Sequence, residues 1–388
     1  MKIGILTLPL HVNYGGILQN WALQQVIKRI GYEPETLSRR YYKPRLSLKV
    51  IACQVKASVS SLVRRYFFGN RKRVVQNLFK RDFSIYVSCC DKDFLGQNID
   101  KTGYIYSSEE LYRKVLSGKY DAFIVGSDQV WREEYSPSIL NYFFDFLPEN
   151  DKCLRIAYAA SFGKSENYIL KKNMQRCREL LRRFDAVSVR EYEGIDILQR
   201  DFSYEKGVKV LDPTLLLPVD TYKKLIKSED HVHEPHVAVY VLDPSEEKDF
   251  IASEVGLRLG LPTKLFSGEN HEGKMQTVSQ WLAEFDGADF IVTDSFHGCV
   301  FSIIFHKPFV AIANQKRGID RFRSLLCDAG LEDRLVYSKR EFMVRKDDLI
   351  IMPDYKEIDQ RLASFRASSF SFLINALKKE KSTSNSKI

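Results

Sequence analysis

Short apolar runs alternate with longer segments of helical periodicity along most of this chain. Runs of four to seven apolar residues, bounded by polar turns, predict strands that are buried on both faces of a parallel sheet. After the glycine pair Gly15–Gly16, apolar residues recur three and four positions apart, which predicts a helix. The expected strands cover 2–8, 120–126, 155–160, 186–189, 209–211, 237–242, 263–266, 289–293 and 308–312.

The segments between these strands are long enough for helices and have the matching periodicity. A strand, a glycine turn and a helix at the N-terminus form the opening unit of a doubly wound sheet, and the same alternation resumes after 237. The chain is therefore expected to be an α/β protein with two Rossmann-like domains. The expected helices cover 17–30, 168–183, 245–259, 275–286, a stretch from 297, 318–329 and 356–379.

The length of 388 residues exceeds what one hydrophobic core usually supports, so two domains are expected. We assign 1–217 to the first domain and 218–335 to the second, with a polar connection over 218–236 as a hinge. Residues 336–388 are expected to form a helical extension that ends in a disordered tail.

Targeting signals and cysteine usage indicate the compartment. The first residues enter a strand without a basic leader or a cleavage site, and no apolar stretch is long enough to span a bilayer. Seven scattered cysteines fit reduced thiols. We expect a cytoplasmic protein, with peripheral association to the inner face of the membrane as a further expectation.

The positive charge of this chain is concentrated in one segment. Residues 36–81 contain thirteen lysines and arginines and no acidic residue, whereas the whole chain has a net charge of +9, which leaves −4 for the rest. Apolar residues are interleaved with these cations, as in helices that lie on an anionic membrane surface. The alternative interpretation is a solvated insertion. No nucleic-acid-binding motif accompanies the charge, so nucleic acid is not expected as a partner.

A single histidine stands where an apolar strand is followed by an apolar helix, in the run 290–298 (FIVTDSFHG). Side chains at the carboxyl ends of strands face the crevice of α/β proteins, and a helix N-terminus offers free N–H groups to an anion. His297 is therefore a candidate catalytic residue. The alternative is that His297 only begins the helix.

Five segments together resemble one family, the polysaccharide pyruvyl transferases. The resemblance covers residues 1 to about 335, and the order and spacing of the segments make it specific. It implies a two-domain enzyme in a GT-B-like arrangement that moves pyruvate from phosphoenolpyruvate onto a sugar as a cyclic ketal. The segments are 13–19 (NYGGILQ), 125–131 (VGSDQVW), 187–191 (VSVRE), 210–214 (VLDPT) and 294–298 (DSFHG).

The resemblance and the chemistry of phosphoenolpyruvate suggest the same roles in the second domain. Protonation of the methylene carbon needs a general acid, and histidine has an unperturbed pKa of about 6.5, so His297 is the expected acid. Phosphate and carboxylate need cationic partners and hydrogen-bond donors. Arginines 321 and 323, on the expected helix 318–329, are interpreted as part of a solvated helix face. The expected donor-binding residues are Arg190, Lys316, Arg317, Ser295 and Gly298.

The first domain is expected to hold the sugar acceptor, carried on a polyprenyl diphosphate. Glycines in the turn after the first strand allow close approach to the backbone. An aspartate that is common in the wider family after the Asn-x-Gly triplet is replaced by Gly16, so Asp128 is the candidate to take part of its role, or else caps the next segment. Tyr14 and Trp131 either stack on a sugar or belong to the core. The expected acceptor-binding residues are Asn13, Gly15, Gly16 and Gln19.

No metal or cofactor is expected beyond the co-substrate phosphoenolpyruvate. His231, His233 and His236 lie close together in the sequence, but they belong to a proline-containing connection that predicts an exposed loop rather than a metal site. Two other functions stay open. A GT-B glycosyltransferase would bind a nucleotide sugar through the same basic crevice residues, and a non-catalytic protein would dock on membranes through 36–81.

Overall fold

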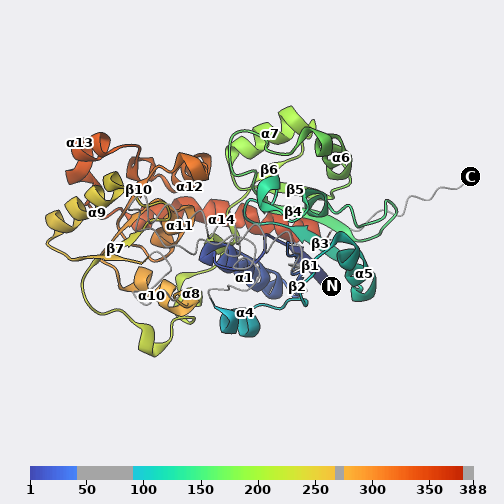
Figure 1. Cartoon of the computed structure of the whole chain (residues 1–388), viewed down its shortest axis with the longest axis horizontal. Coiled ribbons are helices and arrows are strands. Elements are labelled where there is room, and N and C mark those ends of the chain that lie inside the picture. Colours follow the sequence, from blue (N-terminus) through green and yellow to red (C-terminus); the bar gives the residue numbers. More distant parts are fainter. Residues whose placement is uncertain (42–90, 267–274, 379–388) are drawn as a thin grey trace, which may run out of the picture.

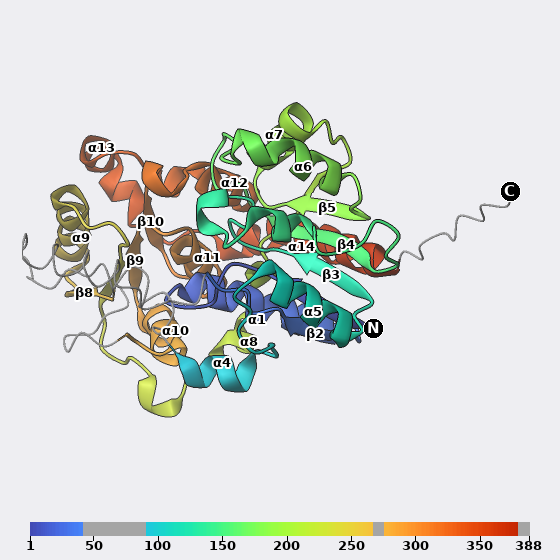
Figure 2. The ribbon, with the colours of Figure 1, turned by 45° about the vertical axis from the view of Figure 1, so that its right-hand side comes forward.

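The computed structural model describes residues 1–41, 91–266 and 275–378. Two parallel sheets lie side by side, each packed against helices (Figures 1 and 2). The first sheet has the strand order β2-β1-β3-β4-β5-β6. Its strands are β1 (Lys2–Leu6), β2 (Glu33–Thr36), β3 (Ala122–Val125), β4 (Leu154–Ala160), β5 (Ala186–Val189) and β6 (Val208–Lys209).

Helices pack against the first sheet because its central strands β3 and β4 are apolar on both faces. Both strands are buried along their whole length. The longer helices are α1 (Tyr14–Arg29), α4 (Lys92–Asn98), α5 (Ser108–Gly118), α6 (Lys171–Leu181) and α7 (Tyr192–Phe202). Short 3₁₀ helices are η1 (Glu133–Tyr135), η2 (Ile139–Phe143) and η3 (Pro213–Leu216).

The second sheet repeats this plan with five strands in the order β11-β10-β9-β7-β8. Its strands are β7 (Val237–Tyr240), β8 (Thr263–Leu265), β9 (Phe290–Thr293), β10 (Phe309–Ile312) and β11 (Leu335–Val336). Its helices are α8 (Val219–Lys223), α9 (Glu246–Leu259), α10 (Val278–Gly287), α11 (Phe296–Ile304), α12 (Asp320–Ala329) and α13 (Lys339–Leu349), with η4 (Ser228–Asp230), η5 (Gln315–Arg317) and η6 (Glu332–Arg334).

A long C-terminal helix, α14 (Tyr355–Lys378), joins the two halves, in agreement with the helical pattern of 356–379. It runs from the second sheet back to the first (Figures 1 and 2). Ser369 on this helix accepts a hydrogen bond from the backbone N–H of Leu211 at 2.9 Å, and Phe372 packs beside Tyr158 of β4. One continuous apolar core therefore includes α1, α10, α11 and α14.

The strand order turns back at one place in each sheet. The chain passes from β1 to β2 on one side and then to β3 on the other, and it does the same from β7 to β8 and β9. At such a switch point the loops at the carboxyl ends of the two central strands separate and leave a crevice for ligands. The two crevices belong to the loops after β1 and β3 and to the loops after β7 and β9.

Most of the expected strands are present. Strand β2 was not predicted, for a physical reason. Strand β2 has the sequence Glu-Pro-Glu-Thr, which lacks the apolar alternation of a strand. It lies at the edge of the sheet, where a proline is tolerated because no second neighbour needs its N–H. The helices α5 and α7 were also not predicted, and the helix expected over 168–183 is shorter, at Lys171–Leu181.

Candidate functional site

A cavity of about 450 Å³ lies where the two switch points face each other. The first half contributes the loops after β1 and β3, and the second half contributes the loops after β7 and β9 together with α12. Of the predicted site residues, six with described side chains line this cavity: Asn13, Gly16, Asp128, Ser295, His297 and Arg317. Further lining side chains include His11, Tyr41, Gln129, Tyr135, Asp294, Phe296 and Arg321.

His297 is the second residue of α11 and is only 6% exposed. Its Nε2 atom has no hydrogen-bond partner and lies 3.9 Å from Oδ2 of Asp212. Burial lowers the pKa of His297 to about 4, with Asp212 opposing and Arg190 adding to the shift. The imidazole of the unliganded protein is therefore neutral, and only an added anion nearby makes protonation favourable.

Gly15 of the first half lies directly against this histidine. A Cβ atom on Gly15 would be 2.0 Å from Nδ1 of His297, which is closer than any non-bonded contact allows. The His297 ring therefore packs against the backbone of α1 from the first half, and no side chain fits between them at position 15. Gly15 was predicted to contact the acceptor, but it is not among the residues that line the cavity.

The start of α11 is held by its own residues. Ser295 is the N-cap, and its Oγ accepts a hydrogen bond from the backbone N–H of Gly298 at 3.3 Å. A Cβ on Gly298 would meet Oγ1 of Thr293 at 2.1 Å, so only glycine allows the helix to begin this close to β9. Ser295 lines the cavity, whereas Gly298 acts through this packing.

Arg190 lies beneath the cavity at the centre of a buried charge cluster. Its guanidinium donates to Glu191 at 3.2 Å, to Asp212 at 2.7 Å and to Asp128 at 3.1 Å, and its side chain is 1% exposed. Asp212 also accepts hydrogen bonds from Ser127 and from the backbone N–H of Thr214. Arg190 was predicted to bind the donor, but each of its nitrogens already has a carboxylate partner.

The charge cluster keeps Asp128 ionised although its side chain is buried. Burial by itself would raise the pKa of Asp128, but the positive charges of Arg190 and Arg321 bring it below its ordinary value. Asp128 also has a φ of 71°, in the left-handed region that side chains rarely adopt. A strained, ionised carboxylate that lines the cavity is a candidate proton acceptor.

Arg321 is the arginine that faces the cavity without a carboxylate partner among the described residues. It lies in the first turn of α12, is 6% exposed, and its Nε has no hydrogen-bond partner. One of its terminal nitrogens donates to the carbonyl of Arg317. Burial, assisted by Arg190, lowers the pKa of Arg321 to about 10. A buried cation in this state favours an anionic ligand.

The prediction that Arg321 and Arg323 form a solvated helix face was therefore wrong for Arg321, although the Arg323 side chain is 54% exposed. Arg317 lines the cavity, and its guanidinium binds Asp243 through two hydrogen bonds of 2.6 and 3.1 Å. Lys316 belongs to η5, but the placement of its side chain lies outside the described part of the chain.

The first-domain turn divides into residues that reach the cavity and residues that hold the turn. Asn13 and Gly16 line the cavity. Gln19 is fully buried; its Nε2 donates to Thr7 and to the carbonyl of Gly16, and its Oε1 accepts from the backbone N–H of Ser127. All the hydrogen-bonding capacity shown for Gln19 is directed into the protein, so it positions the turn rather than contacting the acceptor.

His11 is a lining residue that the sequence reasoning missed. It precedes Asn13 by two positions in the turn after β1, and this proximity was the available signal. Its Nδ1 accepts a hydrogen bond from the backbone N–H of Val12 at 2.8 Å. Tyr41 and Tyr135 also line the cavity, and the hydroxyl of Tyr41 donates to the carbonyl of Tyr135 at 2.7 Å.

The two aromatic candidates differ in position. Trp131 is fully buried and stacks on Phe143, so it belongs to the core. Tyr14 lines the cavity, but it is 2% exposed, stacks on Trp281, and donates its hydroxyl hydrogen to the carbonyl of Gln276 at 2.6 Å. Tyr14 thus links the first turn to the second half of the molecule.

The histidine-rich connection brings two of its three rings together, because His231 and His233 stack with ring centres 6.2 Å apart. His231 and His233 are exposed, whereas His236, expected in an exposed loop, is buried and lies 3.5 Å from Glu284. The Glu284 carboxylate raises the pKa of His236 against the effect of burial. Among residues 1–41, 91–266 and 275–378, no group of three or more His, Cys, Asp or Glu side chains is arranged to hold a metal ion.

Most of the basic segment 36–81 lies outside the described residues, which end at 41 and resume at 91. Of its cations, Arg39 and Arg40 are described, and both are buried and hydrogen-bonded to the protein. In the described part of the chain, no helix has the length and apolar character that crossing a membrane requires. The membrane-binding prediction for this segment stays a prediction.

The fold and the cavity first define a class. Two Rossmann-like domains with a cavity between them form a GT-B arrangement, and two solved UDP-GlcNAc 2-epimerases have a similar fold. The enzyme from Methanocaldococcus jannaschii is 13% identical with a TM-score of 0.51, covering 95% of this chain and 100% of that one. The enzyme from Neisseria meningitidis, bound to UDP-GlcNAc, is 9% identical with a TM-score of 0.50, covering 97% and 99%.

These likenesses establish the fold alone, and the sequence itself supplies the family. Residues 13–316 match the family described as "Polysaccharide pyruvyl transferase". The match spans well over half of the chain, so this chain belongs to the polysaccharide pyruvyl transferase family and is a transferase. No curated protein matches the sequence.

Proposed function

We propose that this protein transfers the pyruvyl group of phosphoenolpyruvate onto two hydroxyls of a sugar and forms a cyclic ketal during polysaccharide synthesis. The observation that supports the proposal is that Arg321 and His297 line the same cavity. Arg321 is a buried cation without a carboxylate partner among the described residues, and His297 is a buried imidazole with an unbonded nitrogen. A small trianion satisfies both.

The donor is assigned to the second-domain side of the cavity. Arg321 and the side chain of Ser295 face the space in which phosphate and carboxylate would lie, and α11 begins there with its positive end. The negative charge of the donor raises the pKa of His297 from its unliganded value of about 4. The donor therefore brings about the protonation of its own general acid.

The proposed reaction balances in protons. Protonated His297 gives its proton to the methylene carbon, which becomes a methyl group, while an acceptor hydroxyl bonds to the adjacent carbon and gives its proton to Asp128. The second hydroxyl then displaces phosphate at the same carbon, and its proton leaves with the hydrogen phosphate. The proton on Asp128 returns to His297 through solvent, so no oxidant or reductant is needed.

The acceptor is assigned to the first-domain side, near Asn13, Gly16 and Asp128. Tyr41 and Tyr135 offer ring faces of the kind that pack against sugars. An acceptor carried on a polyprenyl diphosphate, a contact of 36–81 with an anionic membrane, and a role in capsule synthesis are parts of this proposal. They rest on the family and on the basic segment.

The test is a calorimetric titration of the purified protein with phosphoenolpyruvate and, separately, with UDP-galactose. We expect binding of phosphoenolpyruvate, and we expect His297→Gln to remain folded while phosphate release falls by about 100- to 10,000-fold, the usual contribution of a general acid. Binding of UDP-galactose alone would instead favour a nucleotide-sugar glycosyltransferase. Full turnover by His297→Gln would rule out the proposed acid.

A further inference from the structure

His11 is a second histidine in the cavity, and the proposed reaction leaves it without a role. It lies in the turn after β1, on the same side of the cavity as Asp128, and opposite the residues assigned to the donor. The turn therefore supplies an imidazole to the acceptor side.

The backbone fixes which ring nitrogen of His11 carries the proton. The N–H of Val12 donates to Nδ1 of His11 at 2.8 Å, so Nδ1 accepts and has no hydrogen. The neutral ring must then carry its hydrogen on Nε2. Protonation of Nδ1 would set two N–H groups against each other and break this hydrogen bond.

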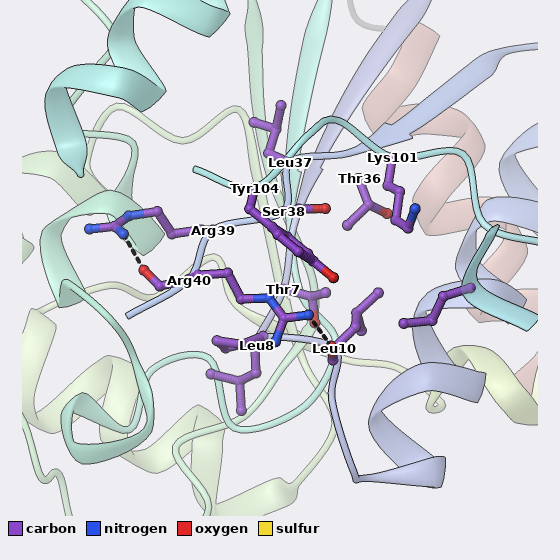
Figure 3. Close-up of a pocket in the computed structure, with 12 residues that line it drawn as sticks. Thr7, Leu8, Leu10, Thr36, Leu37, Ser38, Arg39, Arg40, Lys101 and Tyr104 are labelled. Carbon is purple, nitrogen blue, oxygen red and sulfur yellow. Dashed lines mark hydrogen bonds between the residues drawn. The ribbon is translucent and has the colours of Figure 1, made fainter. Parts of the chain in front are cut away.

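The charged groups near His11 favour the same neutral form. Arg40 donates from Nη2 to the carbonyl of Leu10 at 2.6 Å and so anchors the turn that contains His11 (Figure 3). Burial and the charge of Arg40 lower the pKa of His11 to about 4, while Asp128 acts in the opposite direction. At neutral pH His11 is therefore uncharged, and Asp128 is an ionised carboxylate.

We propose that His11 is a fixed hydrogen-bond donor that binds the acceptor hydroxyl which Asp128 deprotonates, so that this side of the cavity selects a neutral polyol. The inference rests on the proposed function and names the chemistry of its acceptor. A hydroxyl can accept a hydrogen bond from Nε2 of His11 and at the same time donate one to Asp128. A carboxylate or a phosphate dianion has no hydrogen to donate to the ionised Asp128, so neither can make both contacts.

The step assigned to these two residues conserves its atoms. The hydroxyl oxygen bonds to the central carbon of the donor, its hydrogen moves to Asp128, and His11 keeps its Nε2 hydrogen throughout. His11 is therefore a positioning group for the acceptor and does not act as the base. Replacing it is expected to change acceptor recognition, while donor binding stays intact.

The first arm of the test is NMR of the full-length protein with ¹⁵N-labelled histidine, with His11→Phe identifying the signals. We expect His11 to show the Nε2–H tautomer and to keep it from weakly acidic to weakly basic pH. Titration of His11 near the ordinary histidine pKa, or an Nδ1–H tautomer, would overturn the inference. This arm needs no substrate.

The second arm measures the response of the His11 Nε2 signal to two probes in the presence of phosphoenolpyruvate. Methyl β-D-galactopyranoside, a neutral polyol, is expected to shift the signal, and inorganic phosphate is not. No shift from the glycoside at the limit of its solubility, or a larger shift from phosphate, would overturn the polyol assignment.

The third arm separates the acceptor side from the donor side by titrating variants with phosphoenolpyruvate. His11→Phe is expected to bind the donor within about twofold of the unaltered protein, whereas Arg321→Met is expected to lose about tenfold or more. His11→Gln, which restores a donor near the Nε2 position, is expected to regain the glycoside response. Equal loss in His11→Phe and Arg321→Met would place His11 in the donor site and overturn the inference. Failure of the unaltered protein to bind phosphoenolpyruvate overturns the proposed function, while the first arm still decides the state of the ring.

Discussion

Arg190 and Arg321 are two buried arginines whose guanidinium groups lie over the same ring, that of Phe296, at 4.6 and 5.4 Å from its centre. Arg190 belongs to the first half of the molecule and has a carboxylate at each of its nitrogens. Arg321 belongs to the second half, has no carboxylate partner among the described residues, and has an Nε without a hydrogen bond.

The difference separates a structural cation from a ligand-binding one. Carboxylates offset the desolvation of Arg190 and raise its pKa, whereas burial lowers the pKa of Arg321. A partnered buried arginine fixes geometry, and an unpartnered one is costly until an anion arrives. The two arginines thus differ in kind: carboxylates of the protein satisfy the charge of Arg190, whereas an anionic ligand would satisfy that of Arg321.

The largest expected effect concerns the stability role of Arg190. Arg190→Met leaves Asp128, Glu191 and Asp212 buried without their shared cation, so the free energy of unfolding should fall by about 3–5 kcal/mol. Urea denaturation measures this loss. Arg321→Met is the matched control and should unfold at an equal or higher urea concentration. Equal losses of unfolding free energy in the two variants would show that Arg190 is no more important for stability than Arg321.

The next effect concerns the contact between the halves. Gly15→Ala places a Cβ where Nδ1 of His297 lies and must displace the ring, so phosphate release should fall by about 100-fold. Donor binding should persist because Arg321 is untouched. Gly96→Ala in α4, where an added Cβ would meet nothing within 4 Å, is the control. Similar rates of phosphate release in both variants would show that Gly15 does not determine the position of the His297 ring.

A smaller effect is expected for donor affinity. Arg321→Met should weaken phosphoenolpyruvate binding by about 10- to 100-fold, because a charge-assisted hydrogen bond contributes about 1.5–3 kcal/mol. Calorimetric titration gives the affinity directly. Arg323→Met changes an exposed arginine of the same helix and should bind as the unaltered protein does. Undiminished binding by Arg321→Met would assign the donor to other cations.

The smallest effect is a pH dependence. His297 has a pKa of about 4 in the free protein, and the donor raises it, so binding takes up a proton. Donor affinity should therefore rise as pH falls, by at most about tenfold per pH unit, above the free pKa. Calorimetric titration with phosphoenolpyruvate in buffers of different ionisation enthalpy measures the number of protons taken up on binding. The His297→Gln variant shows how much of the pH dependence comes from ionisation of the donor itself. If donor affinity changes with pH as steeply in this variant as in the unaltered protein, His297 is not the group that takes up the proton.

Much of the fold could be read from single runs of residues. The buried strands of parallel sheets are continuous apolar segments, so β3, β4, β9 and β10 stand out from the pattern alone. Strand β2 could not be found in this way, because its pairing with β1 and not its composition makes it a strand. The overlap of the two halves in one apolar core was likewise absent from the linear pattern.

Part of the candidate site also followed from the sequence. His297, Asp128, Asn13, Gly16, Ser295 and Arg317 were named from motifs at strand ends and line one cavity. Arg190 and Gln19 were named on the same grounds, yet they point their polar groups into the protein. Arg321 and His11 reach the cavity without a motif of their own, since helix rotation and a turn decide where they point.

The amino-acid sequence by itself determined which residues form the strands, the glycine turns and the histidine at a helix start, because these depend on local periodicity and on contacts within a few residues. Only the tertiary structure decided which charges are paired. The partners of Arg190 come from the loops after β3, β5 and β6, and these carboxylates pair with Arg190, whereas Asp128 and Glu191 act on Arg321 only at longer range. Burial and charge balance are properties of segments brought together from across the chain, and they distinguish the cation that holds the site from the one that awaits a ligand.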